Sequence, residues 1–227
     1  RGPGCGYAGP MNAPDAPADL ASRTTPDFAA VLARELRVAS LETHPWPVLG
    51  LRGDGTIGYV NPAWSRFAHD NGDGPEVDQR WSLGANYFEA IATPLRAFYR
   101  ELLADAPHRD ASLRPRAHEY ECSSAEVYRR FTLQVYTLAE ARGHVLINSL
   151  VVEHPHDAGR APLAPNDARY RDANGLVHQC AHCRRVERRE GASMWDWVPA
   201  WVRQSPLLTT HTVCDICYGY YYPGLRG

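Results

Sequence analysis

The stretch "VYRRFTLQVYTLAEARGHVLINSLVV", residues 127–152, decides the fold. In its first half apolar and polar side chains alternate, with Phe131, Leu133 and Val135 on one side, which is the period of a β-strand with one buried face. Its second half, residues 144–152, is mostly apolar and contains three valines, which favours a more deeply buried strand. Because only a few residues join the two strands, we expect them to run antiparallel.

Three shorter strands are predicted upstream. The apolar segments 47–52 and 56–60 flank Gly53-Asp54-Gly55, and an Asp-Gly pair between apolar segments indicates a tight β-hairpin. Another short strand is predicted at residues 118–122, just before the long pair.

Helices are predicted between the hairpin and the later strands. Asn61-Pro62 supplies an N-cap and a first-turn proline for a helix over residues 61–71. Thr93-Pro94 supplies the same pair for a helix over residues 93–105. The order of strand, strand, helices and three strands predicts an α+β fold, a five-stranded antiparallel sheet with helices against one face.

The composition is that of a globular protein without a strong electrostatic bias. The chain has 227 residues, 44% of them hydrophobic, and a net charge of −2, so its overall charge does not favour nucleic acid or an anionic membrane surface. No apolar segment approaches the roughly 18–20 residues that cross a bilayer. Residues 1–26 are rich in glycine, proline and alanine and lack the pattern of a signal peptide. A disordered N-terminal lead-in and a cytoplasmic location are therefore expected.

Residues 27–43 are predicted to form an amphipathic helix. Phe28, Val31, Leu32 and Leu36 share one face, with charged residues opposite. Two interpretations are open: this face packs on the chain's own sheet, or it pairs with a second copy in a homodimer.

The order of these elements and their sequences resemble the PAS family over residues 44–153. The resemblance lies in "VLGLRGDGTIGYVNPAWSRFAHDNG" (48–72), "GANYFEAI" (84–91) and "HEYECSSAEVYRRFTLQVYTLAEARGHVLINSLVVEH" (118–154). The last segment is similar to a bacterial subgroup, although Arg130-Phe131 stands where that subgroup usually has Arg-Trp. The resemblance implies a sensory or dimerisation module and names no ligand.

No cofactor motif stands out in the PAS-like segment. A flavin photosensor of this family needs a reactive cysteine in its helical region, and no cysteine lies between Cys5 and Cys122. His69, His108 and His118 are the candidate axial ligands for haem, but single histidines are common on protein surfaces. Haem and a small organic ligand are both left open. Cys122 is expected to be a buried, unreactive thiol.

Catalytic signatures are also missing from the sequence. It contains no phosphate-binding glycine loop, no G-x-S-x-G nucleophile elbow and no kinase-like motif, and its acidic residues do not form a recognisable catalytic pair. We therefore expect a non-enzymatic protein that acts through binding.

Four of the six cysteines stand near the C-terminus in two Cys-x-x-Cys pairs, Cys180/Cys183 and Cys214/Cys217. Residues 154–174 are polar and proline-rich, which indicates a linker, and residues 175–227 are too few to build a core unaided. Two such pairs in a reducing compartment are typical of a tetrahedral, structural Zn²⁺ site. The sequence therefore predicts a four-cysteine zinc module over residues 175–227.

Other side chains are expected to surround this metal rather than bind it. His182 lies inside the first pair and His211 just before the second, and four sulfurs already complete a zinc site. Apolar and aromatic residues of the inserted segment are expected to cover the metal: Trp195, Trp197, Val198 and Trp201.

Two other interpretations of the module are open. In the first, the thiols form a redox switch that releases zinc when they are oxidised. In the second, weaker one, the arginines of "RRVERRE" (184–190) bind DNA, although Glu187 and Glu190 offset their charge.

The cysteine segments also resemble a short cysteine-rich tail that follows PAS domains in some bacterial signalling proteins. Cys180-x-x-Cys183-Arg-Arg-Val and His211-x-x-Cys214-x-x-Cys217-Tyr218 match its two halves. Together the two resemblances imply a signal-sensing or protein-interaction protein that binds protein partners, with a homodimer as the expected assembly.

Overall fold

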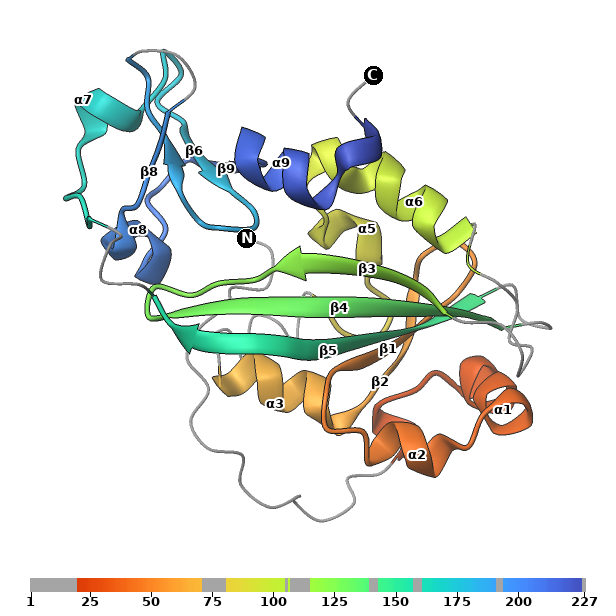
Figure 1. The fold of residues 1–227 in the computed structure, drawn as a ribbon. Coiled ribbons are helices and arrows are strands. Elements are labelled where there is room, and N and C mark those ends of the chain that lie inside the picture. The colour runs from red at the N-terminus through yellow and green to blue at the C-terminus, as the bar shows by residue number, and fades with distance from the viewer. Residues whose placement is uncertain are drawn as a thin grey trace.

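Two β-sheets lie side by side in the computed structural model, which describes residues 20–70, 81–104, 106, 115–138, 143–156, 161–190 and 194–225 (Figure 1). Five strands form the larger sheet and four form the smaller one. Residues 20–156 are called the sheet domain below, and residues 161–225 the C-terminal module.

The larger sheet has the strand order β2-β1-β5-β4-β3, and every neighbouring pair is antiparallel. Its strands are β1 (Val48–Leu51), β2 (Ile57–Val60), β3 (Arg116–Glu121), β4 (Val127–Leu138) and β5 (Gly143–Pro155). The predicted α+β fold with a five-stranded antiparallel sheet is confirmed.

The long pair of strands pairs in the register that its sequence pattern requires. Phe131, Leu133 and Val135 of β4 are all buried, and Val135 lies opposite Leu146 of β5. The register shifts near Val151, which is exposed, because Arg130 faces Val152 while Phe131 faces Leu150. This bulge adds one residue to β5 opposite the Arg130–Phe131 step of β4.

Hydrogen bonds fix the β1–β2 hairpin and the helix after it. The Arg52 N–H donates to the Thr56 carbonyl at 2.8 Å, and Gly55 occupies the left-handed region with φ of 85°. The Asn61 side-chain oxygen accepts from the main-chain N–H groups of Val48, at 2.9 Å, and of Trp64, at 3.0 Å. Asn61 therefore caps the helix as predicted and also ties it to β1.

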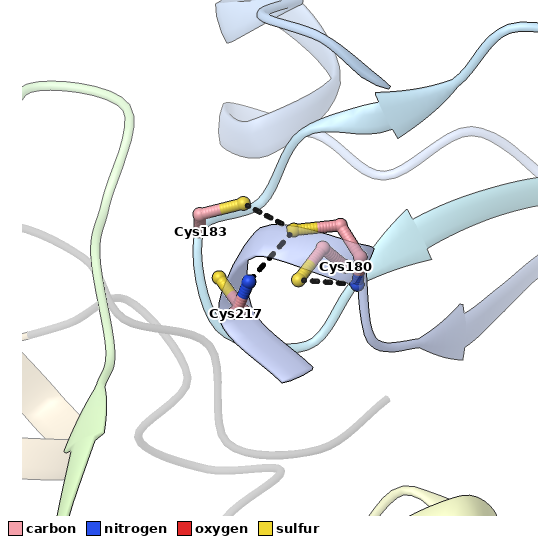
Figure 2. A group of neighbouring side chains, drawn as sticks. Cys180, Cys183 and Cys217 are labelled. Atoms are coloured by element: carbon pink, nitrogen blue, oxygen red, sulfur yellow. Dashed lines mark hydrogen bonds between the residues drawn. The ribbon is translucent and has the colours of Figure 1, made fainter. Parts of the chain in front are cut away.

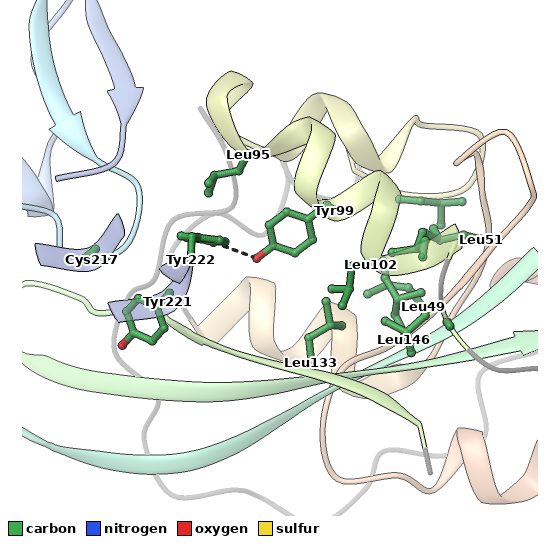
Figure 3. Close-up of a cluster of buried hydrophobic side chains, with 14 of the residues drawn as sticks. Leu49, Leu51, Leu95, Tyr99, Leu102, Leu133, Leu146, Cys217, Tyr221 and Tyr222 are labelled. Atoms are coloured by element: carbon green, nitrogen blue, oxygen red, sulfur yellow. Dashed lines mark hydrogen bonds between the residues drawn. The ribbon is translucent and has the colours of Figure 1, made fainter. Parts of the chain in front are cut away.

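Several helical segments pack on one face of the larger sheet and build the main core (Figure 3). They are α3 (Pro62–Asp70), α5 (Tyr87–Ala90), η2 (Thr93–Leu95) and α6 (Arg96–Ala104). Leu95, Tyr99 and Leu102 meet Leu49, Leu133 and Leu146 of the sheet in this cluster. Thr93 does not cap a long helix as predicted, because the chain enters α6 through the 3-10 turn η2 that buries Leu95.

The predicted N-terminal amphipathic helix is divided into two helices, α1 (Pro26–Glu35) and α2 (Val38–Glu42). Leu36 leaves the helical conformation, and the turn lets Leu41 join Phe28 and Leu32 in one cluster with Val48 and Val145. The apolar face therefore packs on the chain's own sheet and is not available to a second copy.

The end of the predicted disordered lead-in, residues 1–26, is ordered. Residues 1–19 lie outside the described residues, but residues 20–25 pack on the sheet domain, beginning with the short turn η1 (Leu20–Ser22). The Thr25 N–H donates to the Gly58 carbonyl at 2.9 Å, and Arg23 forms a largely buried ion pair with Glu42.

The C-terminal module contains the smaller sheet, in the order β8-β7-β6-β9, with β6 and β9 parallel. Its elements are α7 (Asp167–Tyr170), β6 (Val177–Cys180), β7 (Val186–Glu187), β8 (Trp195–Asp196), α8 (Pro199–Arg203), β9 (Thr209–Thr212), α9 (Asp215–Tyr221) and η3 (Pro223–Leu225). Tyr170 is fully buried with Val177 and Trp201. Part of the predicted linker, residues 154–174, therefore belongs to the module's packing.

Figure 1 shows α9 between the strands of the module and α6 of the sheet domain. Among the described residues, no helix combines the length and the apolar character that a bilayer span requires.

Candidate metal centre and the cavity beside it

The structure brings the four cysteines of the two Cys-x-x-Cys pairs together (Figure 2). Cys180 ends β6, Cys183 closes the turn after it, and Cys214 and Cys217 stand at the start of α9. All four side chains are buried, with at most 5% exposed. Segments 31 residues apart in the sequence, at Cys183 and Cys214, thus meet at one point.

The spacing of the sulfurs suits a tetrahedral metal ion. The four Sγ atoms all lie within 4.8 Å of one another, and those of Cys183 and Cys214 are 3.7 Å apart. Four thiolates about 2.3 Å from a central Zn²⁺ would stand about 3.8 Å apart. The four cysteines could therefore hold a metal ion without a large rearrangement.

Backbone geometry prepares both pairs for this arrangement. The Cys214 N–H donates to the Cys180 sulfur and the Cys217 N–H to the Cys214 sulfur, each at 3.4 Å. Arg184 adopts the left-handed conformation, with φ of 61°, so the chain turns sharply after Cys183. Such N–H···S bonds favour the thiolate forms that a metal ion requires.

The thiols influence one another's ionisation. Hydrogen bonds from Cys183 and the other thiols lower the pKa of Cys180. A hydrogen bond with Cys180 raises the pKa of Cys183, and a separate hydrogen bond with Cys180 raises the pKa of Cys217. Because several anions so close together repel one another, a bound dication would remove the opposition to the last ionisations.

Aromatic residues surround the cysteines, but not all of those expected. Trp195, Tyr218, Tyr221 and Tyr222 pack in the cluster that contains the four sulfurs. Trp197 instead contacts the ring of His156, with 4.6 Å between the ring centroids and the two planes tilted by 58°. The predictions that Trp197, Val198 and Trp201 cover the metal were wrong, because Val198 and Trp201 pack in the cluster of Tyr170 and Trp197 packs against His156.

His182, inside the first cysteine pair, joins the module to the sheet domain. Its side chain is 4% exposed, and burial lowers its pKa, so the ring is neutral. Nδ1 lies 3.0 Å from the Glu121 carbonyl, which can only accept, so Nδ1 donates and Nε2 accepts from the Tyr222 hydroxyl at 2.8 Å. The Tyr222 hydroxyl is in turn 3.5 Å from that of Tyr99 on α6.

A cavity of about 400 Å³ lies where the module meets the sheet domain. The sheet domain contributes most of its wall, including Leu49, Ile57, Trp64, Phe67, Phe131 and Leu133. The module contributes Ala181, His182, Arg184, Thr209, Thr210 and His211. The residues between the first two cysteines and the strand before the last two therefore form part of this wall. Sequence patterns could not reveal the cavity, because its two sides come from separate regions.

His69 and His118, two of the three histidines considered for haem, do not line this cavity. His69 is exposed at the end of α3, and His108 lies outside the described residues. His118 packs between the rings of Phe98 and Tyr222, and burial lowers its pKa to about 4. Nothing in the described wall of the sheet domain therefore offers a histidine to haem iron.

Cys122 also differs from its expected state. It is half-buried and disulfide-bonded. It takes no part in the four-cysteine cluster.

Two arginines of the segment 184–190 are held by acidic neighbours. Arg188 binds Asp196, with 2.8 Å between Nη2 and Oδ1, and Arg189 binds Glu187 at 2.5 Å. Arg184 lines the cavity. The segment is therefore not a continuous basic surface of the kind that binds phosphates along a nucleic acid.

No family model matches the sequence, and no curated protein matches it. Among solved structures, the chain is similar to the PAS domain of an HTR-like protein from Haloarcula marismortui, with 16% sequence identity and a TM-score of 0.32. The match covers 55% of this chain and 95% of that one.

Proposed function

We propose that the protein is a non-enzymatic sensory or interaction protein, in which a PAS-like domain detects a signal and a C-terminal module holds one structural Zn²⁺. Four buried sulfurs within 4.8 Å of one another are the observation that carries the metal part of this proposal. The sensory part is supported by the sequence resemblance and by the cavity that the two regions share.

Zn²⁺ is the ion that suits this donor set best. Four cysteine thiolates in tetrahedral array, with no open position for substrate, are characteristic of structural zinc. The ion would contribute the stability that the short strands of the module lack. The cysteines would hold it, and His182 would orient the Cys180–Cys183 turn against the sheet domain.

The module's position suggests how a signal would be passed on. The Cys180–Cys183 turn and β9 both touch the cavity, so a ligand there would contact the module directly. A change in the module's exposed surface, which includes Ile216 and Tyr220, would then alter binding of a protein partner.

Metal analysis of the purified full chain tests the proposal. We expect one equivalent of zinc per chain, and none in Cys214→Ser. The matched control is Ser205→Ala, which changes a half-buried hydroxyl of the same module away from the sulfurs and should keep the metal. A wild-type chain that stays folded and metal-free after zinc addition would contradict the proposal.

The redox switch is the second candidate, because the Cys183 and Cys214 sulfurs are near enough to form a disulfide after a small movement. Mild peroxide followed by metal analysis and thiol counting separates the two. A structural site with buried sulfurs should keep its zinc. Reversible zinc release with disulfide formation would favour the switch instead.

A further inference from the structure

The cavity between the sheet domain and the C-terminal module has two chemically different ends. The end within the sheet domain is apolar and rich in rings, among them Trp64, Phe67 and Phe131. The end at the module is polar and includes Arg184, Thr210 and His211. A volume of about 400 Å³ with this division suits an amphipathic organic molecule.

Arg96 belongs to the polar end. It begins α6, directly after η2, and η2 lies against β9 of the module. Its Nε donates to the Ile91 carbonyl at 3.1 Å, and within the described part of the chain it forms no ion pair. Its guanidinium therefore keeps donors for a ligand.

Arg184 brings a second positive charge to the same end from the other side. Burial and the nearby charge of Arg184 lower the pKa of His211 to about 4, so this ring is neutral beside the guanidinium. Both residues line the cavity together with Thr210.

The acidic residues of the wall offset these charges only in part. The carboxylate of Glu121 is buried and accepts a hydrogen bond from the Ser123 hydroxyl at 2.6 Å. Glu89 is exposed to solvent on α5, where its charge is screened. The two guanidiniums therefore outnumber the one buried carboxylate of the wall, and the polar end favours an anion over a cation.

We propose that the cavity binds an amphipathic organic anion, an aromatic or aliphatic body with one carboxylate or sulfonate, whose charged end lies against the C-terminal module. The apolar body fills the space among the rings of the sheet domain. Arg96 and Arg184 bind the anionic group, with Thr210 and His211 as further hydrogen-bonding groups. The proposal rests on the proposed function, because the polar end exists only while the metal holds the module in place.

Two fluorescent probes with nearly the same body test the charge preference. 1-Anilinonaphthalene-8-sulfonate carries a sulfonate, and N-phenyl-1-naphthylamine lacks it. The full chain is first shown to contain one zinc, and each probe is then titrated, with calorimetry to fix the stoichiometry. We expect saturable binding of one sulfonate probe per chain, about tenfold or more tighter than the neutral probe, as for a charged hydrogen bond.

Three substitutions test whether the probes bind in this cavity. Arg96→Met should weaken the sulfonate probe about tenfold or more and leave the neutral probe unchanged. Arg100→Met, one turn further along α6 and exposed, is the matched control and should change neither. Ala92→Phe, which adds a ring at the cavity wall, should weaken both.

Three outcomes, each measured on a chain that contains its zinc, would overturn the inference. They are equal affinity for the two probes, no binding of either probe, and binding of several probes per chain that Ala92→Phe does not affect. In each case the zinc content still reports separately on the proposed function.

Discussion

The sheet domain and the C-terminal module are stabilised in different ways. The sheet domain has strands of up to 13 residues, and leucine, valine and aromatic side chains fill the space between its sheet and helices. The module has strands of two to four residues and a small cluster around Tyr170, Val177, Val186 and Trp201. On the side that faces the sheet domain, the module places four cysteines where a larger domain would place apolar residues.

This difference implies that the two regions depend on different interactions. Burial of each large apolar side chain stabilises the sheet domain by about 1.5–3 kcal/mol. In the module one metal ion would replace many such contacts, because its binding and the folding of its ligand loops are coupled. The shared cavity would then exist only when both regions are folded.

Removal of the metal should have the largest effect, because it should unfold the C-terminal module and leave the sheet domain folded. Structural zinc contributes about 10–16 kcal/mol in small zinc peptides at neutral pH, far more than the module's own cluster could supply. We expect chelator with reductant to expose Arg184 and Arg185 to trypsin while Arg129 and Arg130 in β4 stay protected. Limited proteolysis with mass spectrometry checks this, and equal cleavage of both regions would contradict it.

Leu32→Asp should destabilise the sheet domain by about 4 kcal/mol or more, because it places a charge where α1 packs on the sheet. Ala33→Asp, exposed on the same helix, should stay within about 0.5 kcal/mol of the wild type. Urea unfolding followed by circular dichroism measures both. A stable Leu32→Asp chain with a halved molecular mass would instead support the homodimer interpretation.

Tyr222→Phe should have a smaller effect on stability, confined to the contact between the C-terminal module and the sheet domain. It removes the hydroxyl that donates to His182 and leaves a buried acceptor unpaired, at a cost of about 1–3 kcal/mol. We expect faster transfer of zinc to a coloured chelator. Tyr220→Phe is the control, because it removes only an exposed hydroxyl that lies 3.4 Å from Arg130 Nη1. Identical rates for both variants would disprove the role of the Tyr222–His182 contact.

Arg203→Ala should have the smallest effect. The Arg203 and Glu126 side chains are 60% and 42% exposed, and their ion pair at 2.8 Å links the module to the β3–β4 turn. Exposed pairs of this kind contribute about 0–1 kcal/mol. Urea midpoints should therefore barely move, and a loss above about 2 kcal/mol would mean that the junction depends on surface charge.

Local sequence patterns predicted the sheet well. Alternation in β4, the Asp-Gly turn and the Asn61 cap each depend on a few neighbouring residues, so they could be read directly. The division of the N-terminal helix at Leu36 could not, since no glycine or proline marks it. It follows from the packing of Leu41 beside Phe28.

The candidate site was predictable only in part. The spacing of Cys180, Cys183, Cys214 and Cys217 pointed to one cluster, and the structure brings them together. The bonds of His182 to Glu121 and Tyr222 join positions 61 and 40 residues apart, so no local pattern contains them. The cavity is likewise a product of how the two regions pack.

X-ray absorption at the zinc edge of the purified full chain tests the central claim most directly, because it reports the atoms around the metal in place. The account predicts one zinc per chain with four sulfur neighbours at about 2.3 Å and no nitrogen or oxygen ligand. A zinc bound by nitrogen or oxygen atoms, or by fewer than four sulfurs, would contradict it.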